Sequence, residues 1–99
     1  MTMIRRGKYL VTWAGDGQTL VRVRRRWFPW PKQNVVFWRT IYEGRPYGMN
    51  APTFLHDLAH VWQYLQRGWW WVLTKPGPRE REARQWKTGD PKATWVQVQ

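Results

Sequence analysis

The stretch PTFLHDLAHVWQYLQR, residues 52–67, is where the periodicity of the chain changes, and it decides the fold class. Its apolar residues recur at i, i+4, i+7, i+8 and i+11, which is the spacing of one face of an amphipathic helix. These residues are Phe54, Leu58, Val61, Trp62 and Leu65. Pro52 suits a first helical turn, and either Asn50 or Thr53 can cap it. Gly68 follows directly, so we expect the helix to end there.

Upstream of this helix the pattern is that of β-strands. Three runs rich in β-branched and aromatic residues predict strands: KYLVTW (8–13), QTLVRVRRRWF (18–28) and VVFWRTIY (35–42). Asp16-Gly17 is a hairpin turn signal between the first two runs. Pro29 and Pro31 disfavour ladder pairing between the second and third. We therefore expect a small antiparallel sheet of about three strands, with a loop at residues 43–50.

Downstream of the helix, residues 69–78 (WWWVLTKPGP) are expected to form a connector. Three adjacent Trp side chains cannot face one way, so at least one of Trp69–Trp71 should be exposed or meet a partner. We expect two of the three to pack beneath the connector. Residues 79–87 (REREARQWK) predict a second short helix, with Pro78 in its first turn and Gly89 just past its end.

Strands followed by helices indicate an α+β fold. At 99 residues the chain is expected to be a single domain, residues 1–99. Within it, residues 1–34 form a basic hairpin region, residues 35–87 the core and residues 88–99 a tail. The segment ATWVQVQ, residues 93–99, alternates enough to predict a last strand or an extended tail. Ten of the residues are Trp, so a small core can be built from few side chains.

Composition narrows the classes of function. Seventeen Lys and Arg face six acidic residues, and this net charge of +11 favours anionic partners such as nucleic acid or lipid headgroups. The chain has no Cys and no Ser, which excludes disulfides, thiolate metal sites and Ser or Cys nucleophiles. No apolar run reaches the ~18 residues that a membrane span needs. We expect that the first residues are not a signal peptide, and on that interpretation an intracellular or virion-associated protein is favoured.

The segment RVRRRW, residues 22–27, with PWPK after Phe28, interleaves cations and aromatic side chains. This pattern suits phosphate contacts and base stacking, and it also suits the solvated face of a charged edge strand. If it binds a ligand, we expect general contact with nucleic acid or another polyanion. The candidate contact residues are Arg22, Arg24, Arg25, Arg26 and Lys32.

The only two histidines of the chain, His56 and His60, lie one helical turn apart on the same face. Their ring nitrogens can then reach a single Zn²⁺ at ~2.0–2.1 Å, although the same spacing also occurs in helices that bind no metal. A catalytic zinc usually has three protein ligands and one open position. Glu80 or Glu82 could supply the third ligand, and both equally suit solvated positions near a helix N-terminus.

Taken together, HDLAH (56–60), VWQYLQRG (61–68) and PREREAR (78–84) resemble the gluzincin type of zinc metallopeptidase. The resemblance is closer to the short forms found among bacterial and phage-encoded proteins. Their pattern is a helix with HExxH, often continued by an aromatic-Gln pair, and a second helix with an ExEA-like stretch. The resemblance covers residues 35–87 and implies a minimal zincin-like core. It also implies that the strand at 35–42 binds extended substrate.

The resemblance implies a role for each site residue. His56, His60 and Glu80 match the three zinc ligands. Glu82 is the alternate third ligand, or an acid that orients a ligand histidine. Asp57 stands where the family has the catalytic Glu, which takes a proton from the zinc-bound water and passes it to the leaving amine.

The departure at Asp57 leaves two functions open. Asp places its carboxylate ~1.5 Å further back than Glu, and a misplacement of about 1 Å can lower a rate ~10²-fold. The first function is a zinc metallopeptidase, weakly active or inactive, whose substrate is a peptide or protein. The second is a non-enzymatic, basic, polyanion-binding component of a phage particle or a similar assembly.

Overall fold

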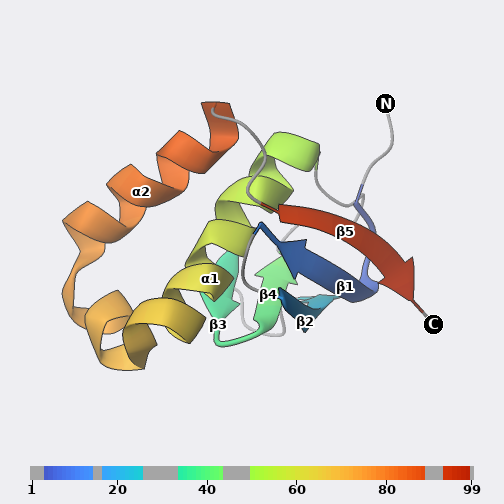
Figure 1. The fold of residues 1–99 in the computed structure, drawn as a ribbon, viewed down its shortest axis with the longest axis horizontal. Helices are drawn as coiled ribbons and strands as arrows, with labels where there is room; N and C mark the ends of the chain where they lie inside the picture. Colours follow the sequence, from blue (N-terminus) through green and yellow to red (C-terminus); the bar gives the residue numbers. More distant parts are fainter. Residues whose placement is uncertain (1–3, 15–16, 26–33, 44–49, 89–92, 99) are drawn as a thin grey trace.

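A five-stranded mixed sheet and two helices make up the α+β fold of the computed structural model (Figure 1). The structure describes residues 4–14, 17–25, 34–43, 50–88 and 93–98. In chain order, the elements are β1 (Gly7–Trp13), β2 (Gly17–Arg25), β3 (Val35–Phe37), β4 (Thr40–Glu43), α1 (Ala51–Thr74), α2 (Pro76–Thr88) and β5 (Ala93–Val98).

The strand order in the sheet is β3-β4-β2-β1-β5. The predicted hairpin of β1 and β2 is present, with Trp13 opposite Gly17, and Gly17 adopts the left-handed φ of 83° that glycine tolerates. The predicted last strand is also present, since β5 pairs antiparallel with β1. The prediction of about three antiparallel strands is wrong, because the sheet has five strands and β2 and β4 run parallel.

The number of strands was underestimated mainly because the run 35–42 forms two strands, β3 and β4, and not one. The chain turns back at Trp38 and Arg39, so that Phe37 lies opposite Thr40. Trp38 takes a φ of 58°, which is uncommon outside glycine and asparagine. The run lacks the Gly, Asn or Asp that marks most two-residue hairpins, and for that reason the turn was not predicted.

The long helix α1 forms as expected at its start and differs after Gly68. The side chain of Asn50 caps the helix by accepting a hydrogen bond from the Thr53 N–H at 2.9 Å. Gly68 breaks the helical conformation with φ 85° and ψ 161°, but the helix resumes and continues to Thr74. The connector predicted for residues 69–78 is therefore wrong, and α2 begins at Pro76. Gly89 lies outside the described residues.

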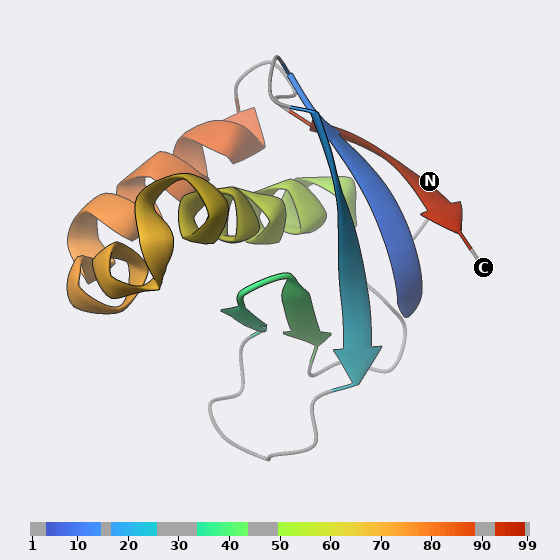
Figure 2. The same ribbon diagram turned by 60° about the horizontal axis from the view of Figure 1, so that its bottom comes forward.

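Both helices lie on one side of the sheet, and α2 packs on α1 (Figures 1 and 2). Three residues of the predicted helical stripe, Phe54, Leu58 and Val61, are fully buried, and Trp62 and Leu65 are partly buried against them. Their partners on the sheet include Val11, Val21, Val23 and Ile41. The helix that carries both histidines is thus fixed by the core.

The Trp residues serve the core only in part. Trp13 and Trp86 are buried and meet edge to face, with ring centroids 6.2 Å apart. Trp69 is 54% exposed and Trp70 is 69% exposed, so the prediction that two of Trp69–Trp71 pack beneath the connector is wrong. Because residues 69–74 are helical, their side chains radiate from an axis and do not lie under a loop. Among the described residues, no helix has the length and apolar character to cross a membrane.

Candidate metal centre

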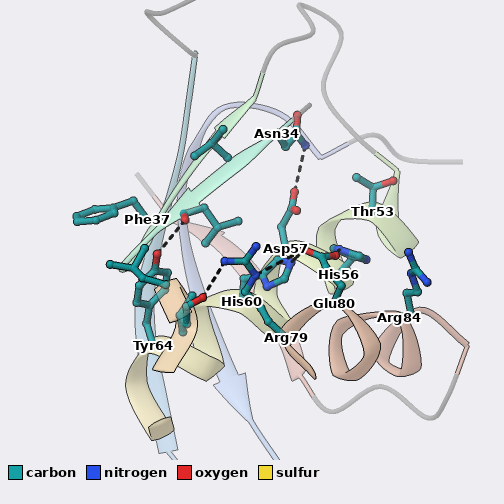
Figure 3. A pocket seen from close by; sticks show the side chains of 14 residues that line it. Asn34, Phe37, Thr53, His56, Asp57, His60, Tyr64, Arg79, Glu80 and Arg84 are labelled. Atoms are coloured by element: carbon teal, nitrogen blue, oxygen red, sulfur yellow. Dashed lines mark hydrogen bonds and ion pairs between the residues drawn. The ribbon is translucent and has the colours of Figure 1, made fainter. Parts of the chain in front are cut away.

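His56, His60 and Glu80 meet between the two helices (Figure 3). The two histidines project from consecutive turns of α1, and Glu80 reaches them from α2. His56 Nε2 lies 3.3 Å from Glu80 Oε2, and His60 Nε2 lies 3.4 Å from Glu80 Oε1. The imidazole ring centroids are 5.0 Å apart. These three residues, which are the ligands that the resemblance implied, form the donor set of the site.

The spacing of these atoms suits a metal ion. Two ligand atoms held at ~2.0–2.2 Å from a tetrahedral ion lie roughly 3.3–3.5 Å from each other. Both histidine-to-glutamate distances fall in that range, and one ligand atom from each residue can be chosen so that all three lie within 4.8 Å of one another. His56, His60 and Glu80 could therefore hold a metal ion.

Gln63, one helical turn after His60, fixes the orientation of that histidine. Its side chain is fully buried, and its Nε2 donates to the Arg79 carbonyl at 3.0 Å and to Glu82 Oε1 at 2.9 Å. Because both partners are acceptors, the amide nitrogen must face them, and Gln63 Oε1 faces His60 Nδ1 at 3.0 Å. His60 therefore carries its proton on Nδ1, which leaves the lone pair of Nε2 directed toward Glu80.

A lone pair that faces a carboxylate oxygen at 3.4 Å needs a cation or a second proton between the two atoms. Burial lowers the pKa of His60, while the Gln63 hydrogen bond and the Glu80 charge oppose that shift. The buried ring therefore resists becoming an imidazolium ion. A neutral imidazole with a bound metal ion satisfies both atoms, which is why the chemistry of this donor set fits a metal.

Glu82 is not part of the donor set. Its Oε1 accepts from Gln63, and its Oε2 pairs with Arg67 Nη2 at 2.7 Å. The contacts run from Glu82 through Gln63 to His60, so an orienting role of Glu82 would act through Gln63. No motif in the sequence indicated a role for Gln63, although its position three residues after His60 places it on the same helix face.

Asp57 lines the same cleft as the donor set. Asp57 as a whole is 5% exposed, and its carboxylate points toward Asn34, whose Nδ2 donates to Asp57 Oδ2 at 3.1 Å (Figure 3). Asn34 precedes β3, so this hydrogen bond joins α1 to the start of the edge strand. No pattern in the sequence indicated a role for Asn34.

An open cleft of about 920 Å³ contains Asp57 and all three residues of the donor set. Residues 34–37, which include the edge strand β3, form one wall, and α1 and α2 form the other. Phe37 and Tyr64 stand at one end, and Thr53 and Arg84 at the other (Figure 3). The donor set is therefore reachable by a ligand that lies along β3.

The three predicted basic residues that the structure describes lie elsewhere. Arg22, Arg24 and Arg25 on β2 are exposed, and Arg22 and Arg24 alternate with buried Val21 and Val23. Since the two valines pack in the core under the helices, the two arginines face the other side of the sheet, away from the cleft. Arg26 and Lys32 lie outside the described residues.

No protein-family model, curated protein or solved structure matches this chain. The donor set and the cleft around it are therefore the features that indicate a function.

Proposed function

We propose that this protein is a small zinc-binding protein of the gluzincin metallopeptidase type, with His56, His60 and Glu80 as the zinc ligands. The observation that carries the proposal is the convergence of two imidazole nitrogens and one carboxylate from two helices, with the His60 tautomer fixed by Gln63. Two histidines and one glutamate form a known set for catalytic zinc.

The donor atoms support zinc over the harder cations. Magnesium and calcium prefer sites made of oxygen ligands, whereas imidazole nitrogen suits zinc and the neighbouring transition metals. Three protein ligands leave a fourth tetrahedral position. The Glu80 side chain is 41% exposed and lines the cleft, so that position would open toward a bound substrate.

The cleft supports a peptide as the substrate. An ion in this set would polarise a carbonyl group and lower the pKa of a water molecule. The edge strand β3 offers main-chain groups with which an extended peptide can pair. Asp57 would take up the proton as a general base, with Asn34 holding one of its oxygens at 3.1 Å. Because that carboxylate is short and held toward Asn34, we propose that turnover is slow.

Metal analysis of the purified protein tests the ligand set. The wild-type protein should bind one equivalent of zinc, and His56→Ala or Glu80→Gln should lose it. Glu43→Gln is the matched control, because it removes an acid that pairs with Arg6 outside the cleft. Full retention of zinc by either ligand variant would show that the ligand assignment is wrong.

A second candidate function is polyanion binding, and the exposed row on β2 is the observation that favours it. Arg22, Arg24 and Arg25 are exposed on a chain with a net charge of +11. Such a face would bind nucleic acid through its phosphates, as in a basic component of a phage particle or similar assembly. Arg22→Gln with Arg24→Gln should weaken salt-dependent binding of single-stranded DNA, while His56→Ala should not. Equal binding by all three proteins would exclude this face as the contact.

A further inference from the structure

Exposed apolar side chains gather in two segments, each of which contributes one such side chain to the lining of the cleft. They belong to the β3–β4 turn and to the helical turns after Gly68, and they are Phe37 (57% exposed), Trp38 (41%), Trp69 (54%), Trp70 (69%) and Leu73 (52%). We refer to these five residues as the aromatic rim. Among the described residues, the other large apolar side chains with comparable exposure are Leu20 and Val96.

The two segments of the aromatic rim lie on the same side of the molecule. Phe37 and Leu73 line the same cleft, and the ring of Tyr64 meets both Phe37 and Trp38 in tilted contacts, at 5.9 and 6.2 Å between centroids. In both ribbon views, the β3–β4 turn and the C-terminal turns of α1 are found at the same side (Figures 1 and 2). The aromatic rim therefore reaches the cleft through Phe37 and Leu73, and its three Trp residues follow or precede these two in the same segments.

The helical part of the rim is held firmly in its exposed position. Gly68 breaks the helix and redirects it, and Val72, which is buried, anchors the turns that follow. Arg79 Nη1 donates to the Val72 carbonyl at 2.8 Å and ties this segment to α2. Trp69 and Trp70 are more than half exposed to water, so they do not contribute the stabilisation that burial of their side chains would give. Exposed apolar patches of this kind usually mark a site of interaction with a partner.

The charges around the rim indicate what that partner is. Arg39 lies 6.0 Å from the Trp38 ring, and Lys75 is exposed directly after α1. Arg67 lies 4.6 Å from the Trp71 ring, but its charge is offset by its pairing with Glu82. A second copy of a chain with a charge of +11 would be repelled, whereas an anionic surface would be attracted. Trp and Leu flanked by Lys and Arg is the composition of segments that lie at the membrane–water interface.

We propose that the aromatic rim docks this protein on the surface of an anionic lipid bilayer, with the mouth of the cleft toward the headgroups. The contact is peripheral, since the rim is a few side chains deep and is flanked by cations. It does not depend on the metal centre, because none of the five rim residues belongs to the donor set.

Co-sedimentation with vesicles tests the proposal. The full chain should bind vesicles of equal parts phosphatidylglycerol and phosphatidylcholine at low salt, and bind pure phosphatidylcholine weakly. Trp69→Ser with Trp70→Ser should weaken the binding at least about tenfold, because each Trp would otherwise withdraw much of its surface from water. Leu20→Ser with Val96→Ser is the matched control, since it removes two exposed apolar residues on the far face of the sheet, and it should leave the binding unchanged.

Three results would overturn the proposal. The first is absence of binding to the anionic vesicles by the folded wild-type protein. The second is equal weakening by the Trp pair and by the Leu20 and Val96 pair, which would indicate general attraction without a defined surface. The third is a dimer in sedimentation equilibrium that the Trp substitutions abolish, since the rim would then bind a second copy. Circular dichroism of each variant confirms that it is folded.

Discussion

Replacing Gln63 by methionine is the sharpest test of how the donor set is oriented. Gln63 is fully buried and makes three hydrogen bonds, to His60, to the Arg79 carbonyl and to Glu82. Methionine has a similar length and fills the same volume, but it offers no comparable donor or acceptor. Gln63→Met therefore removes the contact that fixes the His60 tautomer while it leaves all three ligands in place.

Two effects follow, with separate magnitudes. Loss of a partner that orients a metal-binding histidine typically lowers metal affinity by about 10- to 100-fold, or ~1.4–2.7 kcal/mol. In the metal-free protein, the Arg79 carbonyl loses its Gln63 donor, and we expect a loss of stability of ~1–3 kcal/mol. Gln63→Glu should be less stable again, because its second oxygen would face the Arg79 carbonyl and the Glu82 carboxylate without a proton to share.

The assay is a zinc titration in competition with a chromophoric chelator, paired with urea unfolding of the metal-free protein. Gln66→Met is the control, because Gln66 is exposed on the same helix and should change neither quantity. If folded Gln63→Met binds zinc within about twofold of the wild-type affinity, Gln63 does not set the tautomer of His60 and the reasoning fails.

Three further predictions concern catalysis, the break in α1 and pH. Asp57→Glu should raise any peptidase rate by up to ~10²-fold and Asp57→Asn should abolish it, with zinc content unchanged in both; loss of activity in Asp57→Glu would contradict the role assigned to Asp57. Gly68→Ala should destabilise by about 1–3 kcal/mol in urea unfolding, because φ 85° with ψ 161° is a region that essentially only glycine adopts. Gly77→Ala is its control, since a Cβ there meets only the tip of Arg81 at 4.0 Å and φ is ordinary, and it should not destabilise. Burial raises the pKa of Glu43 although Arg6 lies 3.0 Å away, so the folded state binds this proton more tightly than the unfolded state. The stability of the wild-type protein should therefore fall as pH rises through the interval between the unfolded and folded pKa values of Glu43. Glu43→Gln should remove that fall, and at pH 8 it should be more stable than the wild type by up to about 1 kcal/mol. A variant less stable than wild type at pH 8 would show that the Arg6 pair outweighs burial.

The features that depend on spacing along one helix could be predicted from the sequence. His56 and His60 share a helix face because four residues make about one turn, and the apolar stripe starting at Phe54 follows the same period. Glu80 required the resemblance, since nothing local ties a residue of α2 to a histidine of α1. The alternation of Val21 and Arg22 follows the two-residue period of a strand in the same way, and the structure has them on opposite faces of β2.

The features that depend on contacts between distant segments could not be predicted. β2 and β4 run parallel because the chain turns back at Trp38. The sequence does not mark this turn, since Trp rarely adopts the positive φ that Trp38 has. Gln63 and Asn34 acquire their roles only when α2 and the start of β3 come close to α1. A polar residue within an amphipathic helix gives no sign of which partner it will meet across a helix interface.

The donor set also has a consequence for how long the folded protein persists. Few apolar side chains of α2 are buried, chiefly Ala83 and Trp86, so this helix is held to α1 by a small amount of hydrophobic contact. An ion bound by His56, His60 and Glu80 would act as a clamp between the two helices. Binding to the folded state alone adds ~2.7 kcal/mol when free zinc is at 100 times its dissociation constant. The amount of zinc in the surroundings would then set how often α2 detaches, and with it the rate at which proteases degrade the chain.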